Sequence, residues 1–267
     1  MKNLIRNLPR FLFFTGKGGV GKTTMAVALA AELARRGYPV HLSTTDPAAH
    51  LTQMLAESVP NLRVSRIDPK EETRKYVTSV LKQKQGILSD EDMALLEEEL
   101  RSPCIEEIAV FQAFAQAVAQ GRDRFMVLDT APTGHTLLLL DATESYHREV
   151  AKNSEGVDEA VKKLLPRLRD PHFTKILLIT LPEATPVHKA VRLQEDLRRA
   201  LIEPFAWVIN QSFALSGTSD ALLASRGLHE LKYIEEVLLK NDDRVVIAPW
   251  LANEILGAER LRSLFHA

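Results

Sequence analysis

The chain has 267 residues, of which 45% are apolar and 26% charged, values typical of a globular protein with one large α/β domain or two small ones. Its formal net charge of −1 gives no electrostatic reason to expect nucleic-acid binding. No apolar stretch approaches the roughly 20 residues of a membrane-spanning helix. Residues 4–14 are too short and too interrupted to predict a signal peptide. The single cysteine, Cys104, excludes an internal disulfide and a CxxC zinc site within the chain. We therefore expect a cytoplasmic protein that does not bind nucleic acid.

The first predicted elements flank a glycine-rich loop. The apolar run Phe11–Phe14 predicts a short buried strand, and the Ala- and Leu-rich stretch Thr24–Arg36 predicts a helix that Gly37 ends. The loop between them matches the P-loop motif G-x-x-x-x-G-K-[ST], with Gly16, Lys17, Gly18, Gly19, Val20, Gly21, Lys22 and Thr23. The alternative is a chance glycine turn, which the strand and helix on either side disfavour.

This loop predicts a site for the phosphates of a nucleotide. Glycines allow backbone N–H groups to surround phosphate oxygens, and the helix N-terminus adds the positive end of its dipole. We expect Lys22 to contact the β- and γ-phosphates, the Thr23 hydroxyl to bind Mg²⁺, and Thr24 to donate to the α-phosphate.

Two further strands and a helical block come next. Pro39–Thr44 and Leu62–Ile67 read as strands, the second with alternating polarity. From Pro69 the chain becomes charged and helical, with predicted helices at Glu71–Lys84, Asp90–Leu100 and Ile105–Gln120. We interpret residues 69–121 as a helical insertion between strands.

The second half alternates strands and helices again. Strands are predicted at Arg124–Leu128, closed by Asp129, and at Lys175–Thr180, Phe205–Ile209 and Arg244–Ala248. Residues 136–149 form an apolar segment, and Ser212–Gly227 is polar and turn-rich. Helices are predicted at Glu155–Arg169, broken by Pro166, and at Pro186–Ala200, His229–Lys240 and Gly257–Phe265. The alternation predicts a single α/β domain over residues 1–267, with a doubly wound, mostly parallel sheet of the P-loop NTPase type. A further helical segment lies at about 143–170.

Three polar residues come at strand ends, where open parallel sheets bind ligands. Asp129 reads as a Walker B aspartate that holds Mg²⁺ directly or through water. Asp46 is placed to orient the attacking water, although a cap or turn residue before Pro47 is the alternative. Asn210 is placed to hydrogen-bond the adenine edge, or is a turn residue.

Longer stretches of the sequence resemble the arsenite-translocating ATPase (ArsA) family. They cover nearly the whole chain: FFTGKGGVGKTTMA, STTDPAAHL, LRSPCIEEIAVFQAF, LDTAPTGHTLLLLDAT, TLPEATP, WVIN and APWLANEILGAERL. The family carries two homologous ATPase halves in one chain, and this sequence resembles one half, mostly the C-terminal one. Lys17, directly after the first glycine, is similar to the lysine of the deviant P-loop that this class shares with MinD and the nitrogenase iron protein.

The resemblance implies roles for individual residues. Lys17 crosses a dimer interface to the phosphates of the other subunit, and Asp46 acts as switch I and positions the hydrolytic water. Asp129 begins switch II. Asn210 contacts adenine, and the loop from Pro249 to Leu256 packs near the base.

The resemblance also implies a metalloid site at Cys104, Ser102 and His135. Arsenite and antimonite, As(III) and Sb(III), are soft and favour thiolate. The alternative for a lone cysteine is a small buried hydrophobe, and His135 is alternatively a switch residue. The two-half enzyme supplies further cysteines, whereas this chain has one. A symmetric dimer would bring two together.

The implied function is a Mg²⁺-dependent ATPase that energises export of arsenite or antimonite. Its implied partners are a second copy or a second ATPase half, an integral-membrane efflux pump, and a metallochaperone that delivers As(III). The implied location is the cytoplasm, at the inner face of the membrane when the pump is bound.

Three other functions compete with this one. A targeting chaperone for tail-anchored membrane proteins would use an apolar, often Met-rich groove, but the chain has only five Met and no CxxC motif. A MinD- or ParA-like positioning ATPase would normally have a membrane-binding C-terminal helix or a basic DNA surface. A nucleotide-binding module without turnover is disfavoured because Asp46, Asp129, Lys17 and Lys22 are all present.

Overall fold

A seven-stranded parallel sheet forms the centre of the computed structural model, which describes residues 9–45, 51–55, 57–120, 123–129, 159–241 and 244–252. The strands, in the spatial order β3-β2-β4-β1-β5-β6-β7, have these bounds: β1 (Phe11–Thr15), β2 (Val40–Thr44), β3 (Leu62–Arg66), β4 (Phe125–Asp129), β5 (Thr174–Thr180), β6 (Ala206–Ser212) and β7 (Val245–Pro249). All described neighbouring strands pair in parallel. The chain fills one side of β1 first and then the other, which confirms the predicted doubly wound sheet.

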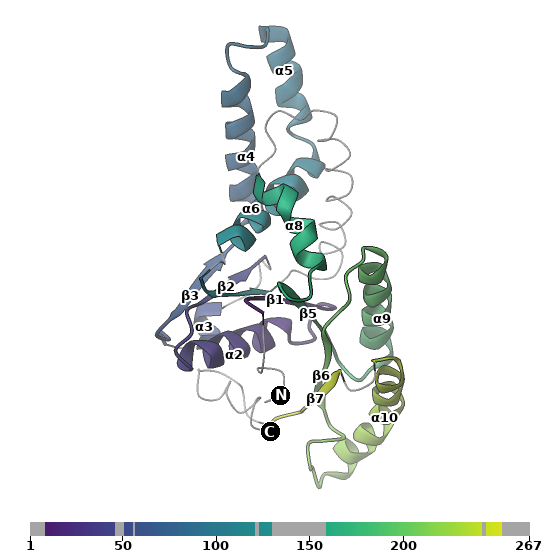
Figure 1. Ribbon diagram of the computed structural model, residues 1–267. Helices are drawn as coiled ribbons and strands as arrows, with labels where there is room; N and C mark the ends of the chain where they lie inside the picture. The colour runs from purple at the N-terminus through teal and green to yellow at the C-terminus, as the bar shows by residue number, and fades with distance from the viewer. Residues whose placement is uncertain are drawn as a thin grey trace.

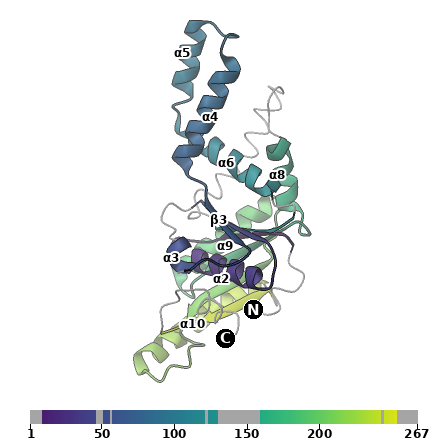
Figure 2. The same ribbon diagram turned by 90° about the vertical axis from the view of Figure 1, so that its left-hand side faces the viewer.

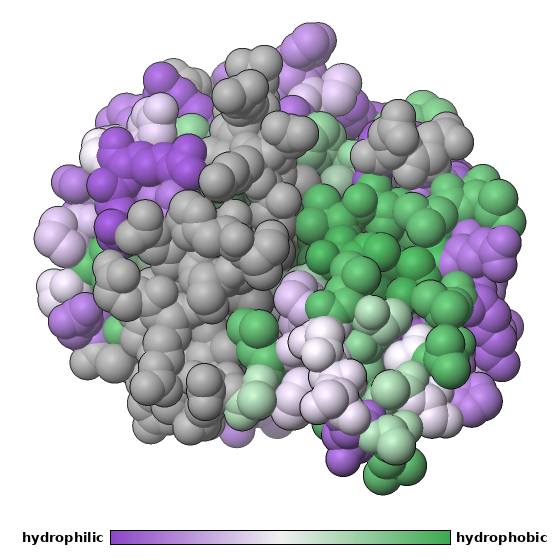
Figure 3. Space-filling model, turned by 90° about the horizontal axis from the view of Figure 1, so that it is seen from below, coloured by the Kyte–Doolittle hydropathy of each residue, from purple (hydrophilic) through white to green (hydrophobic). Residues whose placement is uncertain are grey.

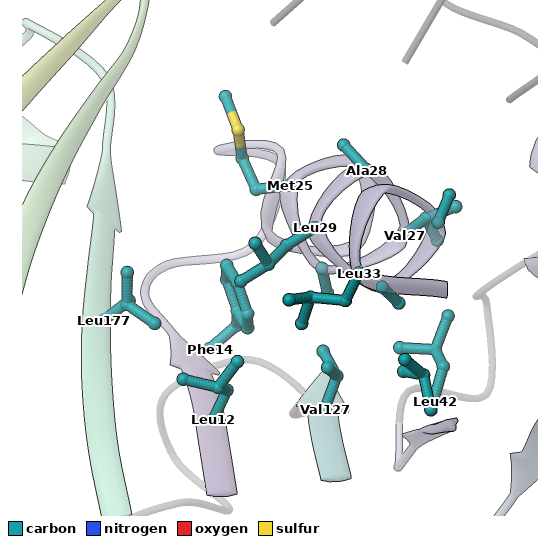
Figure 4. Packing of buried hydrophobic residues seen from close by; sticks show 14 of the residues in the cluster. Leu12, Phe14, Met25, Val27, Ala28, Leu29, Leu33, Leu42, Val127 and Leu177 are labelled. Carbon is teal, nitrogen blue, oxygen red and sulfur yellow. The ribbon is translucent and has the colours of Figure 1, made fainter. Parts of the chain in front are cut away.

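Successive residues of β1 face opposite sides of the sheet, so each face has its own core. Leu12 and Phe14 pack against α2 (Lys22–Arg35), as Figure 4 shows. Phe11 and Phe13 belong to the core of the other face. The helices that supply residues to that second core are α6 (Pro103–Gln120), α8 (Glu159–Arg169), α9 (Ala184–Arg199) and α10 (Ala221–Asn241).

The helix α2 follows the P-loop and ends as its sequence predicts. Gly37 has φ of 86°, a left-handed conformation that suits glycine at a helix end. Its N–H bonds the Ala34 carbonyl at 3.0 Å, and the Tyr38 N–H bonds the Leu33 carbonyl at 3.2 Å. This pair of bonds is the Schellman motif, which satisfies carbonyls left over at the helix C-terminus.

Two helices, α4 (Pro69–Lys84) and α5 (Asp90–Glu99), form an arm that extends from the body (Figures 1 and 2). Asp68 caps α4 by accepting the Lys70 N–H at 3.0 Å, and Ser89 caps α5 by accepting the Asp92 N–H at 3.2 Å. No residue of α4 or α5 is buried. The predicted helices of this block agree with α4, α5 and α6 to within two residues at each end.

One sequence prediction about a helix was wrong, and one short helix was missed. The helix α8 continues through Pro166, which we predicted would break it. The short helix α3 (Leu51–Leu55), packed near α2, was not predicted at all. The predicted segment 136–149 and the predicted helix Gly257–Phe265 lie outside the described residues.

The start of α10 was also predicted wrongly, at His229 instead of Ala221. Asp220 begins the helix, since its carboxylate accepts the Leu223 N–H at 2.9 Å. Gly227, which we placed at the end of a turn-rich stretch, lies inside the helix. A Cβ there would lie only 2.9 Å from the Ala214 nitrogen, so glycine allows this backbone to pass close by.

The helix α10 carries several exposed leucines: Leu222, Leu228, Leu231, Leu238 and Leu239. Figure 3 shows an apolar area on the side of the molecule where α10 lies in Figure 1. Among the described helices, none is long and apolar enough to cross a membrane.

Candidate functional site

The P-loop connects β1 to α2 through three glycines in conformations that other residues rarely adopt. Gly16, Gly19 and Gly21 have φ of 151°, 82° and 91°. Gly21 is the residue before α2, so the helix begins at Lys22. The N-terminus of α2 is therefore directed at the loop, as binding of phosphate at a helix N-terminus requires.

Neighbouring strands contact this loop at both of its ends. At Gly16, a Cβ would lie only 2.2 Å from the Ile179 carbonyl oxygen of β5. At Gly21, a Cβ would lie 2.3 Å from Nδ2 of Asn210, which lies within β6 because that strand continues to Ser212 and does not end at Ile209 as predicted. Gly16 is thus required by close approach to backbone as well as by φ. At Gly21 the near atom ends a side chain, so the positive φ is the firmer reason for glycine there.

Two of the predicted phosphate- and magnesium-binding residues lie at the start of α2. Lys22 is buried, and its Nζ lies 3.3 Å from the Lys17 carbonyl oxygen. Thr23 Oγ1 donates to Oδ2 of Asp129 at 2.8 Å. Lys17 and Thr24 are half-buried.

Asp129 ends β4 and is fully buried. Besides Thr23, its Oδ2 accepts a hydrogen bond from Thr44 Oγ1 at 3.0 Å, and its carbonyl oxygen accepts the Thr45 N–H at 3.0 Å. The structure therefore brings together Thr23 and Asp129, which sequence analysis assigned to the same cation. A hydroxyl and a carboxylate are hard oxygen ligands that suit Mg²⁺.

The other predicted nucleotide residues lie on the β6–β7 side. Asn210 is buried, and its Nδ2 donates to the Val20 carbonyl oxygen at 2.9 Å. Its described contact is thus with the P-loop backbone. Pro249 ends β7 beside Ser212 of β6. Gly18 and Gly19 of the loop are exposed.

The structure describes only some of the residues predicted for water positioning and for the metalloid site. Asp46 and His135 lie outside them. Ser102 is exposed and precedes α6, and Cys104 is the second residue of α6. Within the part of the chain that the structure describes, no group of three or more His, Cys, Asp and Glu is arranged to hold a metal ion.

Sequence analysis missed the residues that fix the end of β6. Glu230 on α10 is buried, and its Oε2 accepts the Ser212 hydroxyl at 2.9 Å and the Ala214 N–H at 3.2 Å. The Trp250 N–H bonds the Ser212 carbonyl at 2.9 Å, and its ring stacks on Phe213 with centroids 5.1 Å apart. The one available signal was a glutamate on the otherwise apolar face of a predicted helix.

Comparisons with known proteins place the chain in one family of ATPases. The profile of the family described as "Anion-transporting ATPase" matches residues 9–155 and 139–267. The chain is 51% identical to an arsenical pump-driving ATPase of Escherichia coli and 50% identical to one of Acidiphilium multivorum, in each case over 98% of the chain. It spans 45% of the length of each of these relatives. It is also 26% identical to the ATPase GET3A of Arabidopsis thaliana, over 96% of the chain and 83% of that protein.

Proposed function

Since the chain belongs to the anion-transporting ATPase family, we propose that it is the Mg²⁺-dependent ATPase unit that energises export of arsenite or antimonite through a membrane pump. The observation that carries this proposal is the hydrogen bond between Thr23 and Asp129 beside the buried Lys22. It joins the P-loop to the end of β4, where a magnesium–triphosphate group needs its ligands. We treat residues 1–267 as one ATPase domain, with the helical insertion at 69–121 and a helical segment at about 143–170.

Phosphoryl transfer needs positioning and charge neutralisation more than covalent chemistry. Backbone N–H groups of the loop and the Lys22 ammonium bind the phosphates of ATP. Thr23 and Asp129 would hold Mg²⁺, which would supply positive charge to offset that of the triphosphate. Asp46 orients the attacking water, and Lys17 neutralises charge from across a subunit interface.

Steady-state ATP hydrolysis and nucleotide binding, with and without Mg²⁺, test this assignment. Lys22→Ala should lose triphosphate binding, whereas Asp46→Asn should keep binding and lose turnover. Lys189→Ala, an exposed lysine on α9, is the matched control and should behave as wild type. Turnover at the wild-type rate in Asp46→Asn would remove the role given to that residue.

We further propose that As(III) or Sb(III) binds Cys104, with His135 and Ser102 completing the site in the assembled ATPase. Either metalloid should stimulate ATP hydrolysis, and Cys104→Ser should abolish the stimulation but keep the basal rate. His135→Ala should weaken it, while His172→Ala, at an exposed histidine, should not. Equal stimulation in Cys104→Ser would refute the metalloid site while leaving the ATPase assignment standing.

The proposed partners follow from this function. The ATPase unit pairs with a second copy or a second ATPase half, so that two nucleotide sites face each other. The pair binds an integral-membrane pump at the cytoplasmic face of the membrane, and a metallochaperone delivers As(III). The supporting observations are the position of Lys17 in the loop and the names of the bacterial relatives.

A further inference from the structure

Asn210 makes a buried contact that recognition of a base does not require. Its side chain is 5% exposed, and its amide bonds the Val20 carbonyl oxygen at 2.9 Å. Since a carbonyl oxygen only accepts, the group that faces it must be the NH₂ of the amide. The residues joined by this bond are 190 apart in the sequence. The bond therefore links β6 directly to the P-loop.

The backbone that follows Asn210, and the contacts that hold it, set the direction of this side-chain amide. The next residue, Gln211, has φ of 57°, and the pairing of β6 with β7 shifts register between Ile209 and Ser212. This irregularity is held from α10, because Glu230 accepts the Ser212 hydroxyl. It is held from β7 by the bond from the Trp250 N–H to the Ser212 carbonyl.

The P-loop is consequently fixed at two points. At its start the loop lies against the backbone of β5 at Ile179, and near its end Asn210 holds Val20 and lies against Gly21. Binding of phosphate by backbone N–H groups depends on their direction, and a loop held in advance loses less conformational entropy when the ligand binds. The bond to the Val20 carbonyl therefore restricts the direction of the neighbouring backbone N–H groups.

We propose that Asn210 is a positioning residue, which sets the conformation of the P-loop for phosphate binding whatever base the nucleotide carries. This inference rests on the proposed nucleotide site. It distinguishes two roles of the Asn210 side chain, which are holding the P-loop and contacting the base. One N–H of Nδ2 is used by the loop, so the second N–H and Oδ1 are what remain for a base. Loss of the side chain should then weaken binding of phosphate chains that have no base at all.

Calorimetric titration with Mg²⁺ and three probes, ATP, GTP and inorganic tripolyphosphate, tests the proposal. Asn210→Ala leaves the Val20 carbonyl without its donor, and we expect all three ligands to weaken by a similar factor, roughly tenfold. Asn210→Asp should weaken them further, because its carboxylate would face the carbonyl oxygen. Gln211→Asn is the control, since Gln211 is exposed and Asn tolerates its left-handed φ. It should bind all three like wild type.

A second readout does not depend on ligand. Hydrogen exchange of the backbone amides of residues 18–22 should be faster in Asn210→Ala than in wild type and unchanged in Gln211→Asn. Should the alanine variant not fold, Asn210→Ser replaces it, since a serine hydroxyl is too short to reach Val20.

The opposite results would overturn the proposal. Weaker ATP binding with unchanged tripolyphosphate binding would mean that Asn210 only reads the base. Unchanged binding of all three probes would mean that the bond to Val20 has no function. If the wild-type protein bound neither ATP nor tripolyphosphate, the proposed nucleotide site and this inference would both be wrong. That result differs from the two outcomes above, in which the wild-type protein binds nucleotide.

Discussion

Gly16 shows how a single missing side chain permits the candidate site. Its φ of 151°, and the 2.2 Å that would separate a Cβ at this position from the Ile179 carbonyl oxygen, leave no room for another residue. We predict that Gly16→Ala lowers the free energy of unfolding by about 3 kcal/mol, because the backbones of β1 and β5 would have to separate. Denaturant unfolding measures this loss.

Gly37→Ala is the matched control for that prediction. Gly37 also has positive φ, of 86°, but a Cβ there meets nothing within 4 Å. Only the backbone strain remains, at about 1 kcal/mol. Equal losses in the two variants would show that φ, and not contact with β5, explains the need for glycine at position 16.

His41 on β2 gives a pH dependence that is separate from the site. The side chain is buried, and its Nε2 lies 2.7 Å from Ser65 Oγ. Burial, together with the charges of Arg63 and Arg124, holds the pKa of His41 below its ordinary value of 6.5. The unfolded chain therefore takes up a proton as the pH falls through 6.5, while the folded protein resists protonation.

We predict that the free energy of unfolding falls as the pH is lowered from 7 to 5, because the unfolded state binds more protons in this range. His41→Gln, which cannot titrate, should show a shallower decline. His172→Gln, at an exposed histidine, should decline like wild type. Parallel pH profiles for wild type and His41→Gln would contradict the prediction.

At the scale of elements, neither helix of the α4–α5 arm has a buried residue, so we expect the cap of α5 to contribute to its local stability. Ser89 accepts the Asp92 N–H and also donates to Asp92 Oδ2 at 2.6 Å. We predict that Ser89→Ala lowers the local stability of α5 by about 1 kcal/mol. Hydrogen exchange of the α5 amides measures this, since global unfolding need not change.

Ser79→Ala provides the comparison for the cap. Ser79 lies within α4 and is exposed, so alanine there removes no cap and is a better helix former. Protection of the α5 amides should be unchanged in this variant. If Ser89→Ala also left them unchanged, contacts along the arm, and not the cap, would hold α5.

At the scale of the whole molecule, the parallel sheet brings separate strand ends to one site. β1 and β4 are neighbours, and β5 and β6 follow on the other side of β1. The loop after β1 therefore meets Asp129 from one side and Ile179 and Asn210 from the other. A substitution in any of these strands should therefore alter phosphate binding even though the residues of the loop are unchanged.

Assembly of two ATPase units is the prediction at this scale. We expect ATP to promote a dimer in the hydrolysis-slow variant Asp46→Asn, and Lys17→Ala to weaken that dimer, because its charge would cross to the phosphates of the other unit. Light scattering at several protein concentrations measures the mass. A strictly monomeric protein that hydrolyses ATP at the full rate would contradict the role of Lys17.

The sequence alone determined the local features of this protein. The apolar runs, the glycine spacing and the Ala-rich stretch after the loop predicted β1, the P-loop and α2, because these depend on neighbours in the chain. The end of α2 at Gly37 was predictable for the same reason. The sequence mispredicted α8 and α10, since packing outweighed the helix-breaking tendency of Pro166 and Gly227.

Only the tertiary structure decided which distant residues meet. The strand order places β4 between β2 and β1, and so puts Asp129 beside both Thr44 and Thr23. The bond from Asn210 to Val20 has no signal in the sequence, because its direction depends on the irregular end of β6. Composition and periodicity report burial and local conformation. They do not specify which buried polar groups satisfy one another across the sheet, and that pairing shapes the site.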